Sequence, residues 1–308
     1  MTSDESSTDS TRNASLITRH PQALIHTALL AVAILFSLNY IISKLAMGHF
    51  APLSFAWLRV AGSAIVLNLI LGRSRTHWSR RDSFHVAGFA ILGVVINQTL
   101  FLSGLALTSA HVAAILITTI PVFALAAAMM LGHERGTAAK VGGIALAGAG
   151  ALLVVGGEGF FEGVNSVVGA LMLVGNCLAY ALYLVLSKPA VERLSPTRVI
   201  ARMFAVGSVL MFPISAVSLW REEWRTIPLS AWIGLALVIA GPTVAAYLLS
   251  AWALRYAESS LVAAYTYVQP VLTTILAAIF LGEHLKSIVA VAAVLIFAGV
   301  WLAGRRTI

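Results

Sequence analysis

Charged residues are scarce in this chain. Only 10% of its 308 residues are Asp, Glu, Lys or Arg, whereas 59% are hydrophobic and the mean hydropathy is +0.92. A water-soluble domain carries about 25% charged residues, so the shortage excludes an ordinary soluble protein. A larger soluble core does not account for it, because the apolar residues come in runs of roughly 20, long enough to cross a bilayer.

Cysteine is nearly absent, and carboxylates are missing from the middle of every apolar run. The single cysteine, Cys177, lies inside such a run, so no intramolecular disulfide and no Cys/His metal cluster can form. Glu134, Glu258 and Glu283 all lie at the ends of runs. There is also no His-Glu-x-x-His motif, no Gly-x-Ser-x-Gly motif and no pair of buried carboxylates. The sequence therefore predicts no catalytic residue, no metal site and no cofactor, and a membrane enzyme is a disfavoured alternative.

The net charge of +8 does not indicate a nucleic-acid partner. The basic residues lie in short loops between apolar runs, which is the ordinary orientation signal of a membrane protein. The predicted partners are therefore the lipid bilayer and a small-molecule substrate, with no nucleic acid. A sensor without flux is also disfavoured, because no sizeable soluble output domain is evident beside residues 1–22.

Ten apolar runs follow a polar, Ser/Thr-rich segment at residues 1–22, which is predicted to be a disordered cytoplasmic tail. The runs cover residues 23–47, 53–72, 84–106, 111–131, 138–156, 167–187, 199–219, 229–254, 261–281 and 287–304. Each is long enough for a membrane-spanning helix, and the loops between them are very short. We therefore predict an all-α integral membrane protein, a compact bundle of ten transmembrane helices.

The distribution of basic residues predicts the orientation. One set of loops and ends carries most of the Lys and Arg residues, and the opposite set holds Arg221, Arg225 and Lys286, with Lys44 near a helix end. By the positive-inside rule the first set is cytoplasmic, which places both termini inside the cell and the protein in the inner membrane. Residues 156–166 are acidic and lack basic residues, so we expect them to form an external loop.

A stretch of the sequence occurs twice. Residues 117–132 and 267–282 each carry Pro-Val in the first half, at Pro121 and Pro270, and end in Leu-Gly. A Glu follows each copy, and further echoes upstream keep the same offset. The chain is therefore predicted to be a tandem duplication with repeats at residues 23–156 and 167–304.

Each repeat holds five spans, an odd number, so the second repeat must enter the membrane upside down relative to the first. Inverted repeats are a frequent architecture of secondary transporters, because two similar folds of opposite orientation can expose one site alternately to each side. The fold prediction is thus two inverted five-helix repeats.

These motifs resemble the EamA family of the drug/metabolite transporter superfamily. The resemblance rests on the Pro-Val…Leu-Gly-Glu helix ends, the Ala-Leu-x-Tyr-like turn before them, and a Pro…Arg pattern at the second span of each repeat. It covers residues 23–304, with one departure where His133 is inserted before Glu134. The family includes amino-acid exporters, the aromatic-amino-acid exporters of the YddG type among them. Proton-driven small multidrug carriers of the superfamily use a mid-membrane Glu in the first span, and its absence here disfavours a proton-coupled cation exporter.

A polar side chain inside a span indicates a structural or functional role, because an unsatisfied polar group there costs several kcal/mol. Helical spacing places Asn176, Tyr180 and Tyr183 on one face, and Tyr265 and Gln269 on another. We predict that such groups line a mid-membrane cavity between the repeats. The candidate substrate-binding residues are Asn39, Ser43, Asn97, Gln98, Asn176, Tyr180, Tyr183, Tyr247, Tyr265 and Gln269.

Three further residues are assigned roles. Arg59 lies about two turns into its span and could bind a substrate carboxylate, the alternatives being structural pairing or snorkelling to the interface. Pro121 and Pro270 remove a backbone hydrogen bond and are predicted hinges, although proline in a membrane helix is often only tolerated.

The predicted function is secondary transport by alternating access. An uncharged, aromatic, hydrogen-bonding cavity suits neutral or zwitterionic solutes, so we expect export of amino acids, aromatic or other neutral ones, or of related small metabolites. The alternatives are import of a small metabolite and export of neutral drugs. Small residues on the span at 138–156 are expected to pack against a neighbouring helix or a second protomer, so the chain is a monomer or a homodimer.

Overall fold

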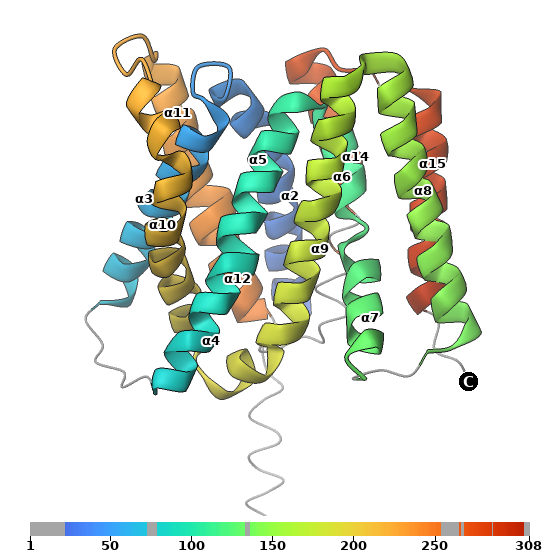
Figure 1. Cartoon of the computed structure of the whole chain (residues 1–308), viewed down its shortest axis with the longest axis horizontal. Coiled ribbons are helices and arrows are strands. Elements are labelled where there is room, and N and C mark those ends of the chain that lie inside the picture. The colour runs from blue at the N-terminus through green and yellow to red at the C-terminus, as the bar shows by residue number, and fades with distance from the viewer. Residues whose placement is uncertain are drawn as a thin grey trace, which may run out of the picture.

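The computed structural model describes residues 22–72, 79–132, 136–253, 265, 268–284 and 286–304. Over these residues the chain is helical, and no strand is formed. Among the described residues, seven helices are long and apolar enough to cross a membrane, and three shorter apolar helices accompany them. Together they form the all-α, ten-span membrane protein predicted from the sequence (Figure 1).

The first repeat begins with two uninterrupted spans, α2 (Gln22–Ala46) and α3 (Pro52–Leu71). Its third span consists of α4 (Arg80–Ala90), the π-helix η1 (Ile91–Ile96) and α5 (Asn97–Leu107). Its last two spans consist of α6 (Ala110–Ile117) with α7 (Ile120–Met130), and of α8 (Ala138–Glu162). The first four predicted runs lie within these bounds to a few residues.

The second repeat repeats this pattern. It begins with α9 (Val164–Arg193) and α10 (Pro196–Arg221). The next span consists of α11 (Leu229–Val238), the π-helix η2 (Ile239–Ala245) and α12 (Ala246–Ala253). The last two spans contain α14 (Val268–Leu281) and α15 (Ser287–Gly304). Residue 254 of the predicted eighth span, residues 261–264, 266 and 267 of the predicted ninth span, and residues 1–21 of the predicted tail lie outside the described residues.

The two repeats run through the bundle in opposite senses. In Figure 1, α4 begins at the lower side and α7 ends there, whereas α9 begins at the upper side and crosses downwards. The repeats are also interlocked, because α2 packs on α11, α12 and α14, while the corresponding α9 packs on α5 and α7. The remaining spans pair with their own counterparts, α3 with α10 and α8 with α15. These reciprocal pairings are those of an inverted duplication.

Corresponding spans of the two repeats are both interrupted by a π-helix, which the sequence analysis did not predict. A π-turn carries an extra residue and changes the direction in which the following side chains point. Asn97 and Gln98 follow η1 directly, and Tyr247 comes shortly after η2. Pro242 lies inside η2 and has no backbone N–H to donate. The Thr243 hydroxyl donates to the Val238 carbonyl at 2.9 Å.

The fourth span is broken at Thr118 and Thr119, just before the predicted hinge. Both hydroxyls donate to the carbonyl three residues earlier, at 2.6 Å. Pro121 then lies in the first turn of α7. A proline there costs no intrahelical hydrogen bond, because the first N–H groups of a helix have no partner within it. The lost hydrogen bond expected from the sequence is therefore wrong for Pro121. Residues 266 and 267 before α14 lie outside the described residues, so for Pro270 the lost bond stays a prediction, as does the hinge role of both prolines.

The loop expected at residues 156–166 is also wrong, while the external side of this segment stays a prediction. The α8 helix continues to Glu162, and α9 begins at Val164. Gly163, with φ +87°, makes the link as a single residue. Glycine adopts this left-handed conformation without a steric cost, and so the chain reverses without a loop.

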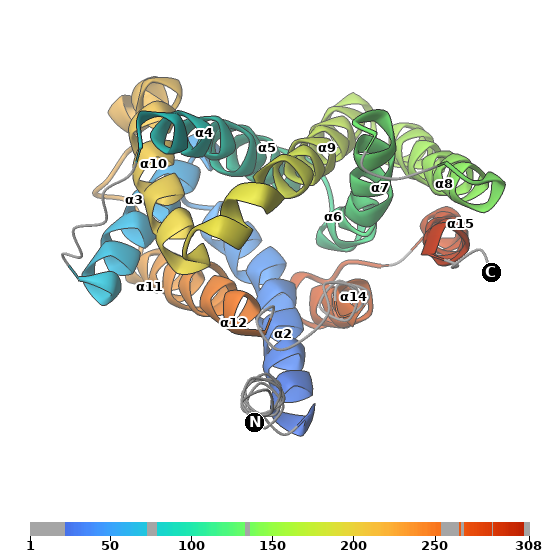
Figure 2. The ribbon, with the colours of Figure 1, turned by 90° about the horizontal axis from the view of Figure 1, so that it is seen from below.

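The small residues of α8 pack against α15, and the two helices lie side by side at one edge of the bundle (Figure 2). A Cβ added at Gly299 of α15 would lie 2.5 Å from the backbone nitrogen of Ala147, and one at Gly150 would lie 2.7 Å from Cγ1 of Ile296. The contact expected between this small-residue surface and a neighbouring helix is confirmed.

Candidate functional site

Arg59 is buried in the interior of the bundle. Its side chain comes from α3, the residue is 3% exposed, and its Nε donates to the Thr243 hydroxyl at 2.9 Å. Its Nη1 has no hydrogen-bond partner among the described residues. An unpaired guanidinium N–H is costly in an apolar interior, so this nitrogen is a strong candidate for an external acceptor.

Tyr247 lies near Arg59, and Tyr180 and Tyr183 lie near Tyr247; we call these four residues the arginine–tyrosine cluster. Tyr247 of α12 lies within electrostatic range of Arg59 and of Tyr180 and Tyr183 of α9. The rings of Tyr180 and Tyr183 are 5.6 Å apart between centroids. Tyr247 packs edge-on against Phe204 at 5.5 Å. Four residues selected from the sequence thus come together from three helices.

Three of the predicted amide residues meet between α5 and α9. The Gln98 Nε2 donates to the Asn97 Oδ1 at 3.2 Å, and the Asn176 Nδ2 donates to the Asn97 carbonyl at 2.9 Å. The Gln98 Oε1 and the Asn176 Oδ1 are buried without a partner in the described part of the chain. Buried polar atoms are nearly always paired, so these two acceptors are candidates for donors on a ligand.

The remaining predicted residues lie apart. On α2, the Ser43 hydroxyl donates to the Asn39 Oδ1 at 3.1 Å, and the Gln269 carbonyl accepts from Ser37 at 3.4 Å. Tyr265 bonds the Nδ1 of His26 through its hydroxyl at 2.7 Å, near the start of α2. Residues 266 and 267, between Tyr265 and Gln269, lie outside the described residues, so the face expected to be shared by these two side chains stays a prediction.

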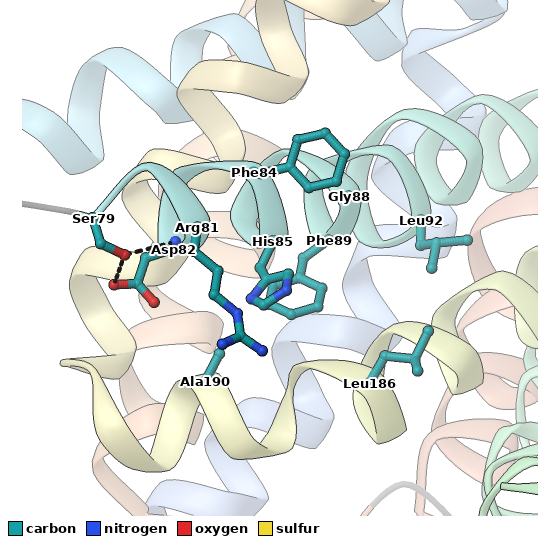
Figure 3. A pocket seen from close by; sticks show the side chains of 10 residues that line it. All are labelled: Ser79, Arg81, Asp82, Phe84, His85, Gly88, Phe89, Leu92, Leu186 and Ala190. Carbon is teal, nitrogen blue, oxygen red and sulfur yellow. Dashed lines mark hydrogen bonds between the residues drawn. The ribbon is translucent and has the colours of Figure 1, made fainter.

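A pocket of about 620 Å³ opens between α4 and α9, on the side of the bundle where α4 begins. Arg81 and His85 contribute polar groups to it, and Figure 3 shows the Arg81 guanidinium extended toward Ala190. None of the ten candidate cavity residues lines it. Its wall residue Phe89, however, packs against Tyr183 with 6.4 Å between ring centroids. One aromatic contact therefore separates the pocket from the arginine–tyrosine cluster.

Sequence reasoning missed a second polar group, at the opposite end of the bundle. Glu283, just beyond α14, accepts from the Lys44 Nζ at 2.7 Å and from the backbone N–H of Ala110 at 2.9 Å. Its Oε2 also lies 3.0 Å from the His111 Nδ1. Burial by itself raises the pKa of this carboxyl, but hydrogen bonds from His111, Lys44 and Ala110 outweigh it and lower the pKa from 4.5 to about 2. The signal in the sequence was Glu283 after Leu-Gly, but nothing there identified its partners.

A protein-family model matches most of the chain and identifies its family. The model described as "EamA-like transporter family" matches residues 23–156 and 167–305. The chain belongs to this family. The resemblance seen in the repeated motifs is thereby confirmed, and the protein is an EamA-type transporter with a multi-pass membrane fold rather than a member of an enzyme family.

Proteins described as transporters match the chain nearly end to end. An uncharacterized transporter of Archaeoglobus fulgidus is 25% identical over 283 residues, which are 90% of this chain and 96% of that protein. The uncharacterized transporter YvbV of Bacillus subtilis is 28% identical over 268 residues, 84% of this chain and 85% of that one. A probable terminal-alkyne amino-acid exporter of Streptantibioticus cattleyicolor is 27% identical over 262 residues, 84% of this chain and 85% of that one.

A solved crystal structure shares the fold. It superposes with a TM-score of 0.58 at 20% sequence identity, covering 95% of this chain and 97% of that chain.

Proposed function

We propose that this EamA-type transporter works by alternating access and exports amino acids, aromatic or other neutral ones, or closely related small metabolites across the inner membrane. The observation that carries the proposal is the unpaired Nη1 of the buried Arg59 within the arginine–tyrosine cluster. A carboxylate supplies the acceptor that this nitrogen lacks, and charge-assisted hydrogen bonds are the strong ones.

The two unpaired amide oxygens can accept hydrogen bonds from the ammonium group of an amino acid. The Gln98 Oε1 and the Asn176 Oδ1 are acceptors, as an ammonium group requires, and neither carries a formal charge. An uncharged acceptor pair together with a guanidinium favours a zwitterion over a cation. The tyrosine rings offer apolar surface with a polar edge to an amino-acid side chain.

The pocket between α4 and α9 supports a route of entry. It lies on the side with most of the basic loops, which the positive-inside rule assigns to the cytoplasm. Rearrangement of the Phe89–Tyr183 contact would join it to the arginine–tyrosine cluster. The amino-acid exporter among the matched proteins supports the substrate class and the direction, since the chain spans most of its length.

The alternatives are import of a small metabolite and export of neutral drugs. A drug without a carboxylate leaves the Arg59 Nη1 without an acceptor, so export of neutral drugs is the weaker of the two alternatives.

The test is counterflow in proteoliposomes that contain the purified protein. The vesicles are loaded with one unlabelled amino acid at a time, with and without an imposed pH gradient, and entry of the labelled amino acid is followed. Accelerated entry that is insensitive to the gradient is the expected result. Matched vesicles with the Tyr180→Ala and the Gln98→Ala variants test the site.

Absence of counterflow with every amino acid overturns the substrate class and leaves the transporter fold standing. Wild-type rates in both folded variants overturn the site. Dependence on the pH gradient overturns uncoupled transport and directs attention to His85 and Glu258 as proton sites.

A further inference from the structure

The hydrogen bonds of Glu283 indicate how the transporter closes at one side of the membrane. We infer that Glu283 and Lys44 are gating residues, which hold the two repeats together at the membrane side where α2 and α14 end and which separate once in each transport cycle. We call Glu283, Lys44 and the backbone N–H groups of Ala110 and His111 the Glu283 gate. The inference rests on the alternating access proposed above but on no particular substrate.

All these contacts cross from one repeat to the other. Glu283 belongs to the second repeat, whereas Lys44, Ala110 and His111 belong to the first. The side chains of Lys44 and Glu283 are 26% and 13% exposed, so solvent screens this ion pair less than it screens a surface pair. The gate is therefore a strong link between parts that must move relative to each other.

A helix terminus completes the gate. Ala110 is the first residue of α6, and the first N–H groups of a helix have no partner within it and carry partial positive charge. Both oxygens of the Glu283 carboxylate accept from the Ala110 N–H, at 3.0 and 2.9 Å. The Lys44 Nζ also donates to the Thr108 carbonyl at 2.6 Å. One carboxylate thus joins the ends of α2, α6 and α14.

The repeated Leu-Gly motif places this carboxylate. Gly282 follows the last residue of α14 and has φ +65°, a backbone conformation that residues other than glycine rarely adopt. The chain turns back so that the Glu283 N–H donates to the Ala277 carbonyl at 3.2 Å. Gly132, its counterpart in the first repeat, has φ +73°. The turn is thus a shared property of the duplicated motif.

The gate differs from the middle of the bundle. Its carboxylate and its ammonium group are both paired, whereas the Arg59 Nη1, the Gln98 Oε1 and the Asn176 Oδ1 have no partner among the described residues. The pocket between α4 and α9 opens at the other side of the bundle. The structure is therefore a state closed at the Glu283 side, and alternating access requires that these contacts break.

The test measures access of a thiol reagent past the gate. In a Cys177→Ala background, Ser43→Cys places a reporter thiol at a fully buried position beside Lys44 on α2. A membrane-impermeant maleimide is added to intact cells and the rate of labelling is measured. Thr226→Cys, on the exposed link between α10 and α11, is the control for the same side.

We expect slow labelling of Ser43→Cys in the intact gate. Glu283→Gln or Lys44→Met should raise the rate about tenfold, the factor that corresponds to one charge-assisted hydrogen bond. Lys44→Arg keeps the charge and should leave the rate low. A purely structural ion pair would lower thermal stability in both neutral variants without raising the rate.

The inference is overturned if Thr226→Cys is labelled and neither neutral variant accelerates labelling of Ser43→Cys. Should Glu283→Gln not reach the membrane, Lys44→Met decides alone, because it removes only the bonds to Glu283 and Thr108. Should Thr226→Cys not be labelled in intact cells, the same comparison in inside-out vesicles decides. The assay needs no substrate, so failure of the gate and failure of amino-acid counterflow are separate results.

Discussion

Arg59 and Glu283 show two ways in which this protein handles a buried or half-buried charge. Glu283 is surrounded by donors from a lysine, a histidine and a helix terminus. Arg59 has a neutral hydroxyl partner at Nε and no partner at Nη1 among the described residues. A paired charge stabilises one arrangement of the helices, whereas an unpaired one favours whatever ligand completes it.

Replacing Arg59 should separate transport from stability. We expect Arg59→Met to lower counterflow of amino acids by about tenfold or more, because a charge-assisted hydrogen bond contributes roughly 1.5–3 kcal/mol. The thermal midpoint in detergent should not fall, because the change removes an unpaired buried N–H and the Thr243 hydroxyl keeps its bond to Val238. Arg202→Met, at an exposed position on α10, is the matched control. Wild-type counterflow by Arg59→Met would contradict the carboxylate assignment.

The pKa of Glu283 predicts how the gate responds to pH. A carboxyl with a folded-state pKa of about 2 and an ordinary value of 4.5 contributes its stabilisation above the ordinary value and loses it as the pH falls toward 2. Glu283 should therefore stay ionised between about pH 5 and pH 8. The measurement is the infrared difference spectrum between the wild type and Glu283→Gln. A band of a protonated carboxyl at pH 5 that is missing in the variant would contradict this assignment.

At the scale of single helices, interruptions decide where the side chains point. The π-helices η1 and η2 occur in corresponding spans, and both precede candidate site residues. The break at Thr118 and Thr119 falls ahead of Pro121, so the interruption of this span lies between α6 and α7. Sequence patterns located the prolines, but a helical period of 3.6 residues cannot show where the chain departs from it.

The tight pairing of α8 and α15 makes a prediction at the same scale. Gly299→Ala should destabilise the protein by roughly 1–3 kcal/mol, because the added methyl group meets the backbone of α8 at 2.5 Å and the helices must move apart. Thermal unfolding in detergent measures the effect.

Gly148→Ala on α8 is the control, since its added Cβ has no neighbour within 4 Å. Equal stabilities of the two variants would show that α8 and α15 do not pack as closely as described.

For the whole molecule, the odd number of spans in each repeat has the largest consequence. Five spans per repeat require an inverted second copy, and the reciprocal packing of α2 and α9 follows from it. The same duplication supplies a Leu-Gly turn to each half, at Gly132 and Gly282. An even number would have produced two parallel copies, which could not exchange roles between the two membrane sides.

The orientation in the membrane can be tested with two single cysteines on the Cys177→Ala background. Thr226→Cys, between α10 and α11, should react with an impermeant maleimide in intact cells, and Ser195→Cys, between α9 and α10, should react only after permeabilisation. Reaction of Ser195→Cys alone in intact cells would reverse the predicted orientation. Reaction of both would contradict a single span between them.

The sequence by itself determined the membrane environment, the ten spans, the duplication and its inversion. Hydrophobic length, span parity and repeated motifs are properties of the chain in order, and they do not depend on contacts between distant residues. They also selected Arg59, Tyr180, Tyr183 and Tyr247, because polar and aromatic residues stand out against an apolar run.

Only the tertiary structure decided which of these residues meet. It placed Tyr247 near Arg59, with Tyr180 and Tyr183 near Tyr247, and joined Glu283 to Lys44 across 239 positions of the chain. It also replaced the expected loop at residues 156–166 with a continued helix and the single-residue turn at Gly163. The physical reason is that hydrogen bonds and ion pairs form between side chains that helix packing brings together, and π-turns and glycine turns set that packing through backbone angles that no residue pattern specifies.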